Sequence, residues 1–195
     1  MAYACLRSTN RLWQAYDGAP SENLYGTDLL SDFIELGYEL FCDRDKLKAT
    51  FIPSDVFDLE TPLNQLEGQM GIVYAGSFFH LFDYESQKTV GLRIVRLLKA
   101  EPGVVLIGRN IGNIQPGMYP KNASPGESQR YMHDSKTWRK MWDDIGSETG
   151  TRWDVQAEMD DLGFEGRGSS QDALKLKEHM EYAGYRRLRF VVKRL

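Results

Sequence analysis

Three turns of this chain place acidic or small residues where they can bind a nucleoside. Each turn follows a short apolar run typical of a buried strand. The turns are Thr27-Asp28-Leu29-Leu30, Ser54-Asp55-Val56-Phe57 and Ala75-Gly76-Ser77-Phe78-Phe79-His80. A carboxylate at a strand end can accept hydrogen bonds from both hydroxyls of a ribose, and one beside an apolar side chain can hold the amino group and ring of an adenine. Taken singly, Asp28 and Asp55 are more often turn residues or helix caps, but their succession at strand ends favours a binding role.

A second set of side chains can meet a substrate. Arg109 follows the apolar run Val104–Ile107, where its guanidinium can bind a carboxylate with two hydrogen bonds; an ion pair with a loop acid is the alternative. His80 can take a proton or point at a substrate oxygen, although a lone histidine is more often structural. His133, which precedes a predicted helix cap, is no better a candidate than His80. Aromatic residues can wall a pocket for a bulky apolar substrate, or form ordinary core; they are Phe78, Phe79, Phe82, Tyr84, Tyr119 and Tyr131.

These residues need a framework, and the chain around Gly71 to Gly112 indicates what it is. Ile72–Tyr74 and Val104–Ile107 are short, β-branched runs that predict buried strands. Between them, apolar residues recur at helical spacing, at Val90, Ile94, Leu97 and Leu98. A strand, a crossover helix and a strand form the repeating unit of a parallel sheet, in which ligands bind beyond the carboxyl ends of the strands.

The rest of the chain extends this unit into one α/β domain. Further strands are predicted over Asn23–Gly26 and Phe51–Ile52, and Asn113–Arg130 is predicted to be a long loop. Helices are predicted over Arg7–Tyr16, Asp32–Lys48, Thr61–Gln69 and Gln171–Tyr182, and Ser31 is the predicted N-cap of the second. A further helix carries Trp138 to Ile145 and is capped by Ser135 or Asp134. Alternating patterns predict that Arg152–Met159 pairs antiparallel with Arg187–Lys193. We therefore expect a single domain over residues 1–195, with a mostly parallel sheet, helices on both faces and an antiparallel carboxyl-terminal strand pair.

Composition limits the classes of function. The 195 residues carry a net charge of −4, which argues against a nucleic-acid or anionic-membrane surface. Cys5 and Cys42 are too few for a thiolate metal site or a disulfide framework and indicate a reducing compartment. No apolar run reaches the length of a membrane span, and the first residues do not resemble a signal peptide. We expect a cytoplasmic protein with no metal, no nucleic acid and no membrane partner.

The segments Tyr74–Asp83 and Gly103–Arg109 resemble those of class I S-adenosylmethionine-dependent methyltransferases, which have a Rossmann-like sheet. The resemblance is strongest to the fungal group that methylates meroterpenoid and related polyketide intermediates. It covers the chain from about Asp17 to Leu195, including the helix from His133 to Trp142 and the ending Arg-Phe-Val-Val-Lys-Arg-Leu. The resemblance implies that S-adenosylmethionine is the cofactor and assigns a set of residues to it: Asp28 to the ribose, Leu29 to the adenine, Asp55 with Val56 and Phe57 to the adenine amino group and ring, and Ala75, Gly76 and Ser77 to the methionine part.

The resemblance also implies a reaction. A methyl group would pass to an oxygen of a small-molecule substrate, with a carboxylate as the expected acceptor, His80 as the catalytic candidate, and Phe79, Arg109, Tyr119, Tyr131 and His133 on the substrate side. The competing hypothesis is a protein that has lost methyl transfer and acts as a cyclase, an isomerase or a binding protein on the same type of substrate. A homodimer is compatible with either.

One feature departs from the family. Its members open with an apolar strand and a glycine-rich turn that approaches the cofactor closely, whereas this chain has no glycine before Gly18. We therefore expect the domain to be amino-terminally truncated relative to the family pattern. Either the first strand is missing, or Met1–Leu6 substitutes for it. An empty central slot would leave rows of unpaired backbone groups at about 1–3 kcal/mol each, more than a domain stable by about 5–15 kcal/mol tolerates. We therefore expect Met1–Leu6 to be paired on both sides, with Cys5 protected from thiol reagents.

Overall fold

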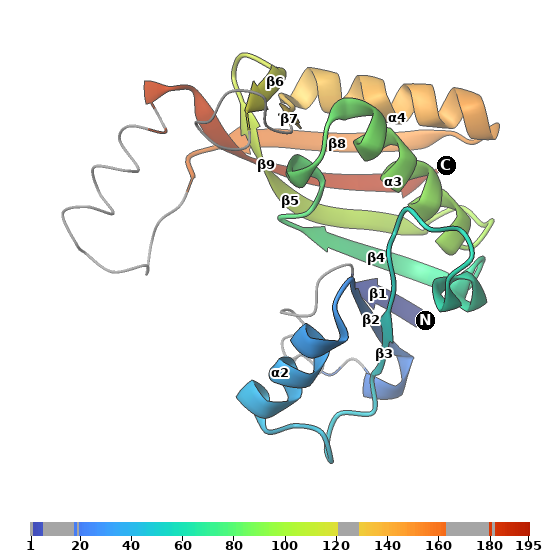
Figure 1. The fold of residues 1–195 in the computed structure, drawn as a ribbon. Helices are drawn as coiled ribbons and strands as arrows, with labels where there is room; N and C mark the ends of the chain where they lie inside the picture. Colours follow the sequence, from blue (N-terminus) through green and yellow to red (C-terminus); the bar gives the residue numbers. More distant parts are fainter. Residues whose placement is uncertain (1, 6–17, 19, 121–128, 163–179, 181) are drawn as a thin grey trace.

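The computed structural model describes residues 2–5, 18, 20–120, 129–162, 180 and 182–195. Within them, one sheet is formed by β1 (Ala2–Cys5), β2 (Leu24–Asp28), β3 (Thr50–Pro53), β4 (Met70–Gly76), β5 (Val105–Asn113), β8 (Trp153–Asp160) and β9 (Tyr185–Arg194). The strand order is β3-β2-β1-β4-β5-β9-β8 (Figure 1). The strands from β3 to β5 are parallel, and β9 runs antiparallel to β5 and β8. The predicted parallel sheet with an antiparallel carboxyl-terminal pair is confirmed.

The short first strand occupies the centre of the parallel part of the sheet. Ala4 of β1 lies opposite Tyr25 of β2 on one side and opposite Val73 of β4 on the other. The prediction that the opening residues fill this slot is therefore confirmed for the backbone, and the alternative of a missing strand is wrong. The side chain of Cys5 and the predicted helix Arg7–Tyr16 lie outside the described residues, as does most of the predicted helix Gln171–Tyr182.

Two helices, α3 (Tyr84–Leu97) and α4 (Ser135–Thr149), cover one face of β4, β5, β9 and β8 (Figure 1). Their N-termini are capped by Asp83, which accepts from Ser86 N (2.8 Å), and by Asp134, which accepts from Thr137 N (2.7 Å). The apolar positions that recur at helical spacing are fully buried against the sheet; they are Val90, Ile94, Leu97, Trp138, Met141, Trp142 and Ile145. The Asp134 cap that the sequence offered is confirmed.

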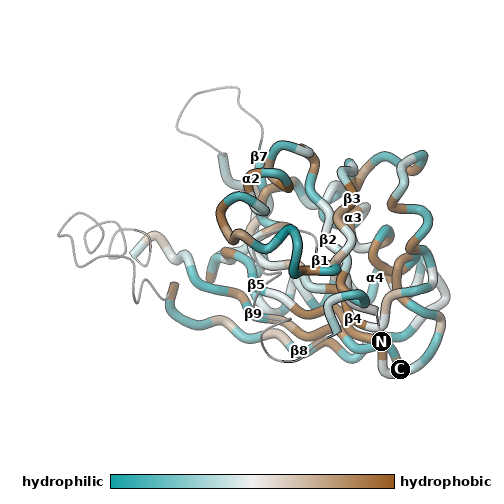
Figure 2. The backbone as a smooth tube through the Cα atoms, turned by 90° about the horizontal axis from the view of Figure 1, so that it is seen from below, coloured by the Kyte–Doolittle hydropathy of each residue, from teal (hydrophilic) through white to brown (hydrophobic). Residues whose placement is uncertain are grey.

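The helix α2 (Ser31–Phe41) differs from its prediction at both ends. Leu30, not Ser31, is its N-cap, and Cys42, whose φ of 49° is left-handed, stops it well before Lys48. The segment predicted as a helix after Thr61 forms only a short 3-10 turn, η3 (Pro62–Leu66), and η2 (Ser21–Asn23) is another such turn. Hydrophobic stretches lie on the strands and also on α2 (Figure 2). Several apolar side chains of α2 and of the turn before it are exposed: Leu29, Leu30, Phe33, Leu36 and Leu40.

Two expectations about the region after the fourth strand are wrong. The strand β5 does not end before Arg109 but continues to Asn113, because β9 pairs with it along its whole length. The predicted loop Asn113–Arg130 contains β6 (Gly117–Pro120), which forms an antiparallel hairpin with β7 (Gln129–Met132). Neither β6 nor β7 alternates apolar and polar residues clearly enough to be recognised as a strand without its partner.

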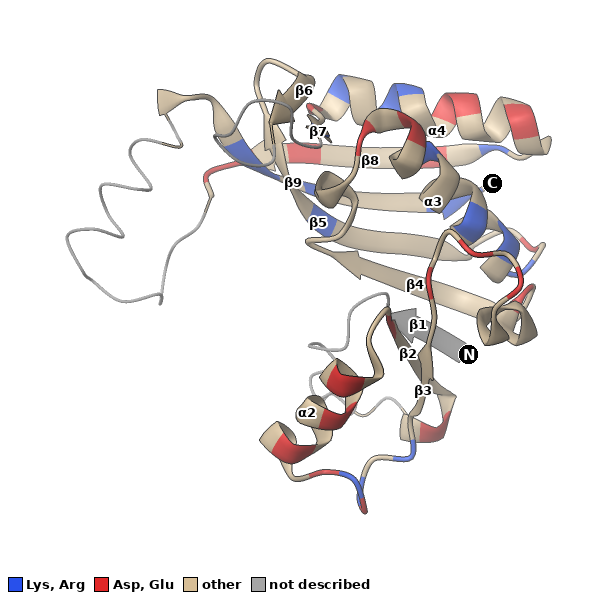
Figure 3. Cartoon of the chain, in the orientation of Figure 1, with Lys and Arg blue, Asp and Glu red and all other residues tan. Residues whose placement is uncertain are grey.

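Charged side chains link the last two strands of the sheet. Basic residues of β9 lie beside acidic residues of β8 (Figure 3), and Arg187 Nε and Arg189 Nε lie 2.9 Å and 2.8 Å from the carboxylate oxygens of Asp160. Among the described helices none is long and apolar enough to span a bilayer. The same part of the chain gathers no group of three or more potential metal-binding side chains.

Candidate functional site

The carboxyl ends of β2 and β3 open into a pocket that contains most of the residues predicted to bind a nucleoside. Because these strands are parallel, the turns that follow them meet at one edge of the sheet. The cavity has a volume of about 170 Å³ and is lined by Thr27, Asp28, Leu29, Ser54, Asp55, Val56, Phe57, Phe78 and Phe82. Pockets for a whole drug-sized ligand usually measure about 300–1,000 Å³, so this one suits a part of a larger ligand.

Backbone contacts hold the two acids of the pocket in position. Asp28 Oδ1 accepts from Leu30 N at 3.3 Å, and Asp55 Oδ1 accepts from Phe57 N at 2.9 Å. These are the turn contacts that the alternative interpretation expected, and each uses one carboxylate oxygen. In the described part of the chain, the second oxygen of each acid makes no further hydrogen bond. The turns thus orient both carboxylates and leave each with an oxygen for a ligand.

A buried hydroxyl supports a polar ligand in this pocket. Ser54 is only 8% exposed, and its Oγ has no hydrogen-bond partner among the described residues. A buried hydroxyl without a partner costs about 1–3 kcal/mol, so a ligand that bonds to Ser54 would remove this cost. The neighbouring wall is aromatic: the ring of Phe82 lies 5.0 Å from that of Phe57 and 5.3 Å from that of Phe78, both edge-on. A flat, polar-edged ring such as adenine fits this combination.

The turn after β4 is fastened to β5. Ser77 has a left-handed φ of 57°, and its N–H donates to Arg109 O at 2.6 Å. Phe78 N–H donates to Asn110 Oδ1 at 3.3 Å, and His80 Nδ1 lies 3.5 Å from the same oxygen. Asn110 is buried and therefore positions both the turn and the histidine. The sequence places Asn110 just after the apolar run Val104–Ile107, but only the pairing of β4 with β5 shows that it meets this turn.

A second cluster joins the hairpin to the helices. The ring of His133 lies 4.7 Å from that of Tyr131 and 5.4 Å from that of Trp138, and His133 Nδ1 lies 3.1 Å from Thr137 Oγ1. Burial lowers the pKa of His133 from 6.5 to about 4, against the opposing effect of the Asp134 carboxylate. This histidine is neutral at physiological pH.

Gln87 connects this cluster to the pocket. It is fully buried, and its Nε2 donates to Phe82 O at 2.9 Å and to Tyr131 O at 2.8 Å. Tyr131 N–H also donates to Phe82 O, at 2.8 Å. The backbone beside the pocket at β2 and β3 is thus fixed to the hairpin by a buried amide and a backbone hydrogen bond. No local sequence pattern pointed to Gln87.

The structure separates the five residues that were predicted to contact a substrate. Tyr131 and His133 lie together, whereas Tyr119 packs on Tyr185 at 5.8 Å. Phe79 is fully buried between Trp138, at 5.0 Å, and Phe190, at 6.2 Å, so its interpretation as a pocket wall is wrong and it belongs to the core. Arg109 lies within β5 and is exposed, not beyond the strand end. Local spacing could not reveal this, since the core contacts of Phe79 come from α4 and β9.

Comparison with solved structures identifies the fold. The chain matches a 1,6-didemethyltoxoflavin-N1-methyltransferase of Burkholderia thailandensis, solved with S-adenosylhomocysteine, with a TM-score of 0.64 at 11% identity over 99% of this chain and 71% of the other. It matches the [4+2]-cyclase SpnF with a TM-score of 0.66 at 13% identity, over 98% and 74% of the two chains. The fold is therefore that of the S-adenosylmethionine-dependent methyltransferases.

Sequence comparison places the chain more narrowly. It is 40% identical over 185 residues to the O-methyltransferase phiE of a fungal species (strain ATCC 74256), covering 92% of this chain and 61% of that protein. It is 38% identical over 180 residues to the O-methyltransferase atr3 of Stereocaulon alpinum, covering 92% and 49%. No protein-family model matches. The chain is thus a relative of fungal O-methyltransferases and spans between about half and three fifths of their length.

Proposed function

We propose that this chain binds S-adenosylmethionine and transfers its methyl group to an oxygen of a small fungal secondary metabolite of the meroterpenoid or polyketide type. The observation that carries the proposal is the pocket in which Asp28, Asp55 and the Ser54 hydroxyl, which has no partner among the described residues, meet an aromatic wall. Two fungal relatives at about 40% identity bear the name O-methyltransferase or methyltransferase, which agrees with this chemistry.

The residues of the pocket have separate roles in this proposal. Asp28 accepts hydrogen bonds from the ribose hydroxyls, with Leu29 against the adenine. Asp55 holds the adenine amino group, with Val56 and Phe57 against the ring. The turn Ala75–Ser77, fastened to β5, lies beside the methionine part. Ser54 Oγ gains the partner that it lacks in the described chain.

Catalysis in this proposal rests on orientation. When bound, S-adenosylmethionine supplies a methyl group that a substrate oxygen takes in line, while the bonding electron pair stays on sulfur. Holding the two reactants in line can supply about 7–11 kcal/mol of the barrier. A carboxylate acceptor needs no proton removed; for a hydroxyl acceptor, His80, positioned by Asn110, is the candidate to take the proton. Tyr119, Tyr131 and His133 form the candidate substrate side.

A second function stays open because of one observation. The sequence lacks a glycine before Gly18, and the matched structure SpnF is described as a [4+2]-cyclase, so the same fold serves a reaction other than methyl transfer. A chain that kept the substrate side but not the cofactor would act as a cyclase, an isomerase or a binding protein. The single-domain organisation, the possible homodimer, the cytoplasmic location and the absence of nucleic-acid partners stay predictions.

Calorimetry with S-adenosylhomocysteine tests the proposal. Asp28→Asn and Asp55→Asn should each weaken binding about 10- to 100-fold, since a hydrogen bond to a charged group contributes about 1.5–3 kcal/mol. Asp58→Asn is the matched control, because Asp58 belongs to the same exposed turn, where it caps Glu60 N, but does not line the pocket. No binding to the parent chain at millimolar ligand, or equal losses in all three variants, would contradict the proposed cofactor site.

The absolute affinity provides another prediction. Losing several backbone contacts of a glycine-rich turn, at about 1 kcal/mol each, predicts that S-adenosylhomocysteine binds one to about three decades more weakly than to the longer relative phiE. The two proteins should be titrated side by side. Equal affinities would show that this chain replaces those contacts by others.

A further inference from the structure

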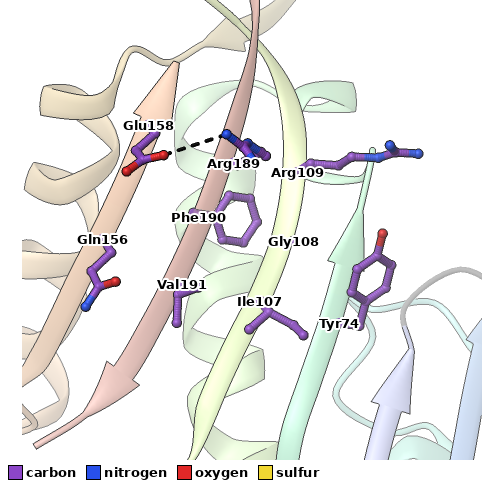
Figure 4. Close-up of a pocket in the computed structure, with 9 residues that line it drawn as sticks. All are labelled: Tyr74, Ile107, Gly108, Arg109, Gln156, Glu158, Arg189, Phe190 and Val191. Carbon is purple, nitrogen blue, oxygen red and sulfur yellow. Dashed lines mark ion pairs between the residues drawn. The ribbon is translucent and has the colours of Figure 1, made fainter. Parts of the chain in front are cut away.

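A hollow lies on the face of the sheet opposite α3 and α4. Its volume is about 470 Å³, and its walls come from β4, β5, β8 and β9 (Figure 4). Apolar side chains form its floor, among them Ile107 and Val191, and two guanidinium groups, those of Arg109 and Arg189, stand at the end where β4 stops. The hollow is separate from the pocket at the carboxyl ends of β2 and β3.

The two arginines of the hollow differ in their partners. Arg189 Nε lies 2.8 Å from Asp160 Oδ2, and its guanidinium lies 3.7 Å from Glu158 (Figure 4). Arg109 is paired in register with Arg189 on one side and with Gly76 on the other, so neither neighbour offers it a carboxylate. Within the described residues, the Arg109 side chain makes no ion pair or hydrogen bond. An exposed cation that no described carboxylate neutralises favours a bound anion.

The neighbouring side chain also has an unused polar group. The ring of Tyr74 lies over Gly76, where a methyl group would collide with its hydroxyl, so the glycine allows the tyrosine to lie flat on the strand. No hydrogen bond to the Tyr74 hydroxyl is found in the described part of the chain. Figure 4 shows this hydroxyl directed to the end of β4, with Arg109 pointing away from Arg189 and past that end. A guanidinium and a phenol hydroxyl together suit a carboxylate.

This pair is level with the acid that is proposed to hold the ribose. Through β1, Gly26 of β2 is level with Tyr74 of β4 and Ile107 of β5, and Asp28 and Arg109 each stand two residues further along. Three strand spacings of about 4.8 Å separate them, which makes about 14 Å. The extended amino-acid chain of the cofactor and the arginine side chain each reach roughly 6–7 Å at ordinary bond lengths, so together they span this gap.

We propose that Arg109, assisted by Tyr74, binds the carboxylate at the amino-acid end of S-adenosylmethionine. This assignment rests on the proposed function and replaces the expectation that Arg109 meets a substrate carboxylate. It gives the cofactor a second anchor on β5, away from the segment where the family pattern places a glycine-rich turn. The other source of the same chemistry, a carboxylate on the substrate, is the alternative that the experiment separates.

Two ligands that differ only at this end provide the test. S-adenosylhomocysteine carries the amino-acid carboxylate, and 5′-methylthioadenosine lacks the amino-acid part but keeps the adenosine and the thioether. Calorimetry should show that Arg109→Gln raises the Kd of S-adenosylhomocysteine about tenfold and changes that of methylthioadenosine less than about twofold, with Arg109→Lys recovering most of the loss. Arg189→Gln, which alters the other guanidinium of the hollow, should leave both values within about twofold.

The outcomes separate this assignment from the proposed function. If the parent chain binds neither ligand, the proposed function fails and the assignment fails with it. If both ligands bind but Arg109→Gln weakens them equally or leaves S-adenosylhomocysteine unchanged, only the assignment is overturned. An unchanged Kd for S-adenosylhomocysteine together with a raised KM for a carboxylate substrate assigns Arg109 to the substrate instead. Thermal melting of each variant verifies that it is folded.

Discussion

Proline at position 4 is the sharpest test of the central strand β1. Ala4 stands between Tyr25 of β2 and Val73 of β4, and proline has no N–H to donate to either neighbour. The lost hydrogen bond costs about 1 kcal/mol, and the carbonyl left without a donor costs about 1–3 kcal/mol. Ala4→Pro should therefore destabilise the fold by about 2–4 kcal/mol, a large share of the about 5–15 kcal/mol that holds a domain together.

Thermal unfolding followed by circular dichroism measures this loss. For a chain of this size 1 kcal/mol corresponds to about 2–4 °C, so the Tm of Ala4→Pro should fall by about 4–16 °C. Ala2→Pro is the matched control, because proline is tolerated at the first residue of a strand and Ala2 begins β1; its Tm should fall by less than about 2 °C. A thiol titration adds a second measurement: only Cys42, which is exposed, should react in the native state, and both cysteines after unfolding.

Equal melting of the two proline variants would refute the reasoning. It would mean that β2 and β4 do not depend on β1 and close on each other directly. Two reactive thiols in the native protein would point the same way. Hydrogen exchange of the β2 and β4 amides then decides the matter, because a paired central strand protects them from solvent and an absent one does not.

The remaining predictions concern single side chains of the described core and helix ends. The folded state holds His133 neutral with a pKa of about 4 instead of 6.5, so the unfolded chain binds an extra proton and stability is lost as pH falls from about 6.5 to about 4. Urea titrations should show this loss as about 2 kcal/mol between pH 7 and pH 5, and His133→Asn should abolish that part of the pH dependence. If the free energy of unfolding changed equally with pH in the parent and the variant, burial would not hold the histidine neutral. Phe79→Ala should lower the free energy of unfolding by about 3–5 kcal/mol, since the ring is fully buried. Phe57→Ala at the pocket should lower it by less than about 1 kcal/mol and weaken the binding of S-adenosylhomocysteine instead. The reverse pattern would mean that Phe79 contacts a ligand. Asp134→Ala should remove about 0.5–2 kcal/mol through its lost cap, while Asp143→Ala on the same helix should stay within about 0.5 kcal/mol, and similar losses would mean that the cap contributes little.

The sequence predicted most residues of the pocket at β2 and β3, because the patterns that mark them are local. A strand that stops at an acid is visible in a few residues, and parallel strands bring successive carboxyl ends to one edge. Asp28 and Asp55 could therefore be assigned to one pocket from the sequence alone. Thr27 and Ser54, which line the same cavity, could have been selected by the same signal.

The placement of Phe79 and Arg109 could not be predicted in this way. Phe79 is next to Phe78 in sequence, but the contacts that bury it come from Trp138 and Phe190. The local sequence places Arg109 beyond a strand end, and only the pairing with β9, in which Arg109 lies opposite Arg189, extends β5 past it. The contacts of Asn110 with Phe78 and His80 could not be predicted for the same reason, whereas the β6–β7 hairpin was missed because neither of its strands alternates apolar and polar residues clearly.

The sequence by itself determined the succession along the chain of the main-sheet strands and of α2, α3 and α4, the acids at the strand ends, the Asp134 cap and the need for a strand in the central slot. These follow from apolar periodicity, turn chemistry and the cost of unpaired backbone groups, which act over a few residues or apply to any sheet. The tertiary structure alone decided the register of Ala2–Cys5 in that slot, the burial of Phe79 in the core and the lack of a carboxylate partner for Arg109 among the described residues. The reason is physical: strand registers and side-chain burial depend on contacts between segments up to about a hundred residues apart, and no local pattern specifies which partner a side chain meets.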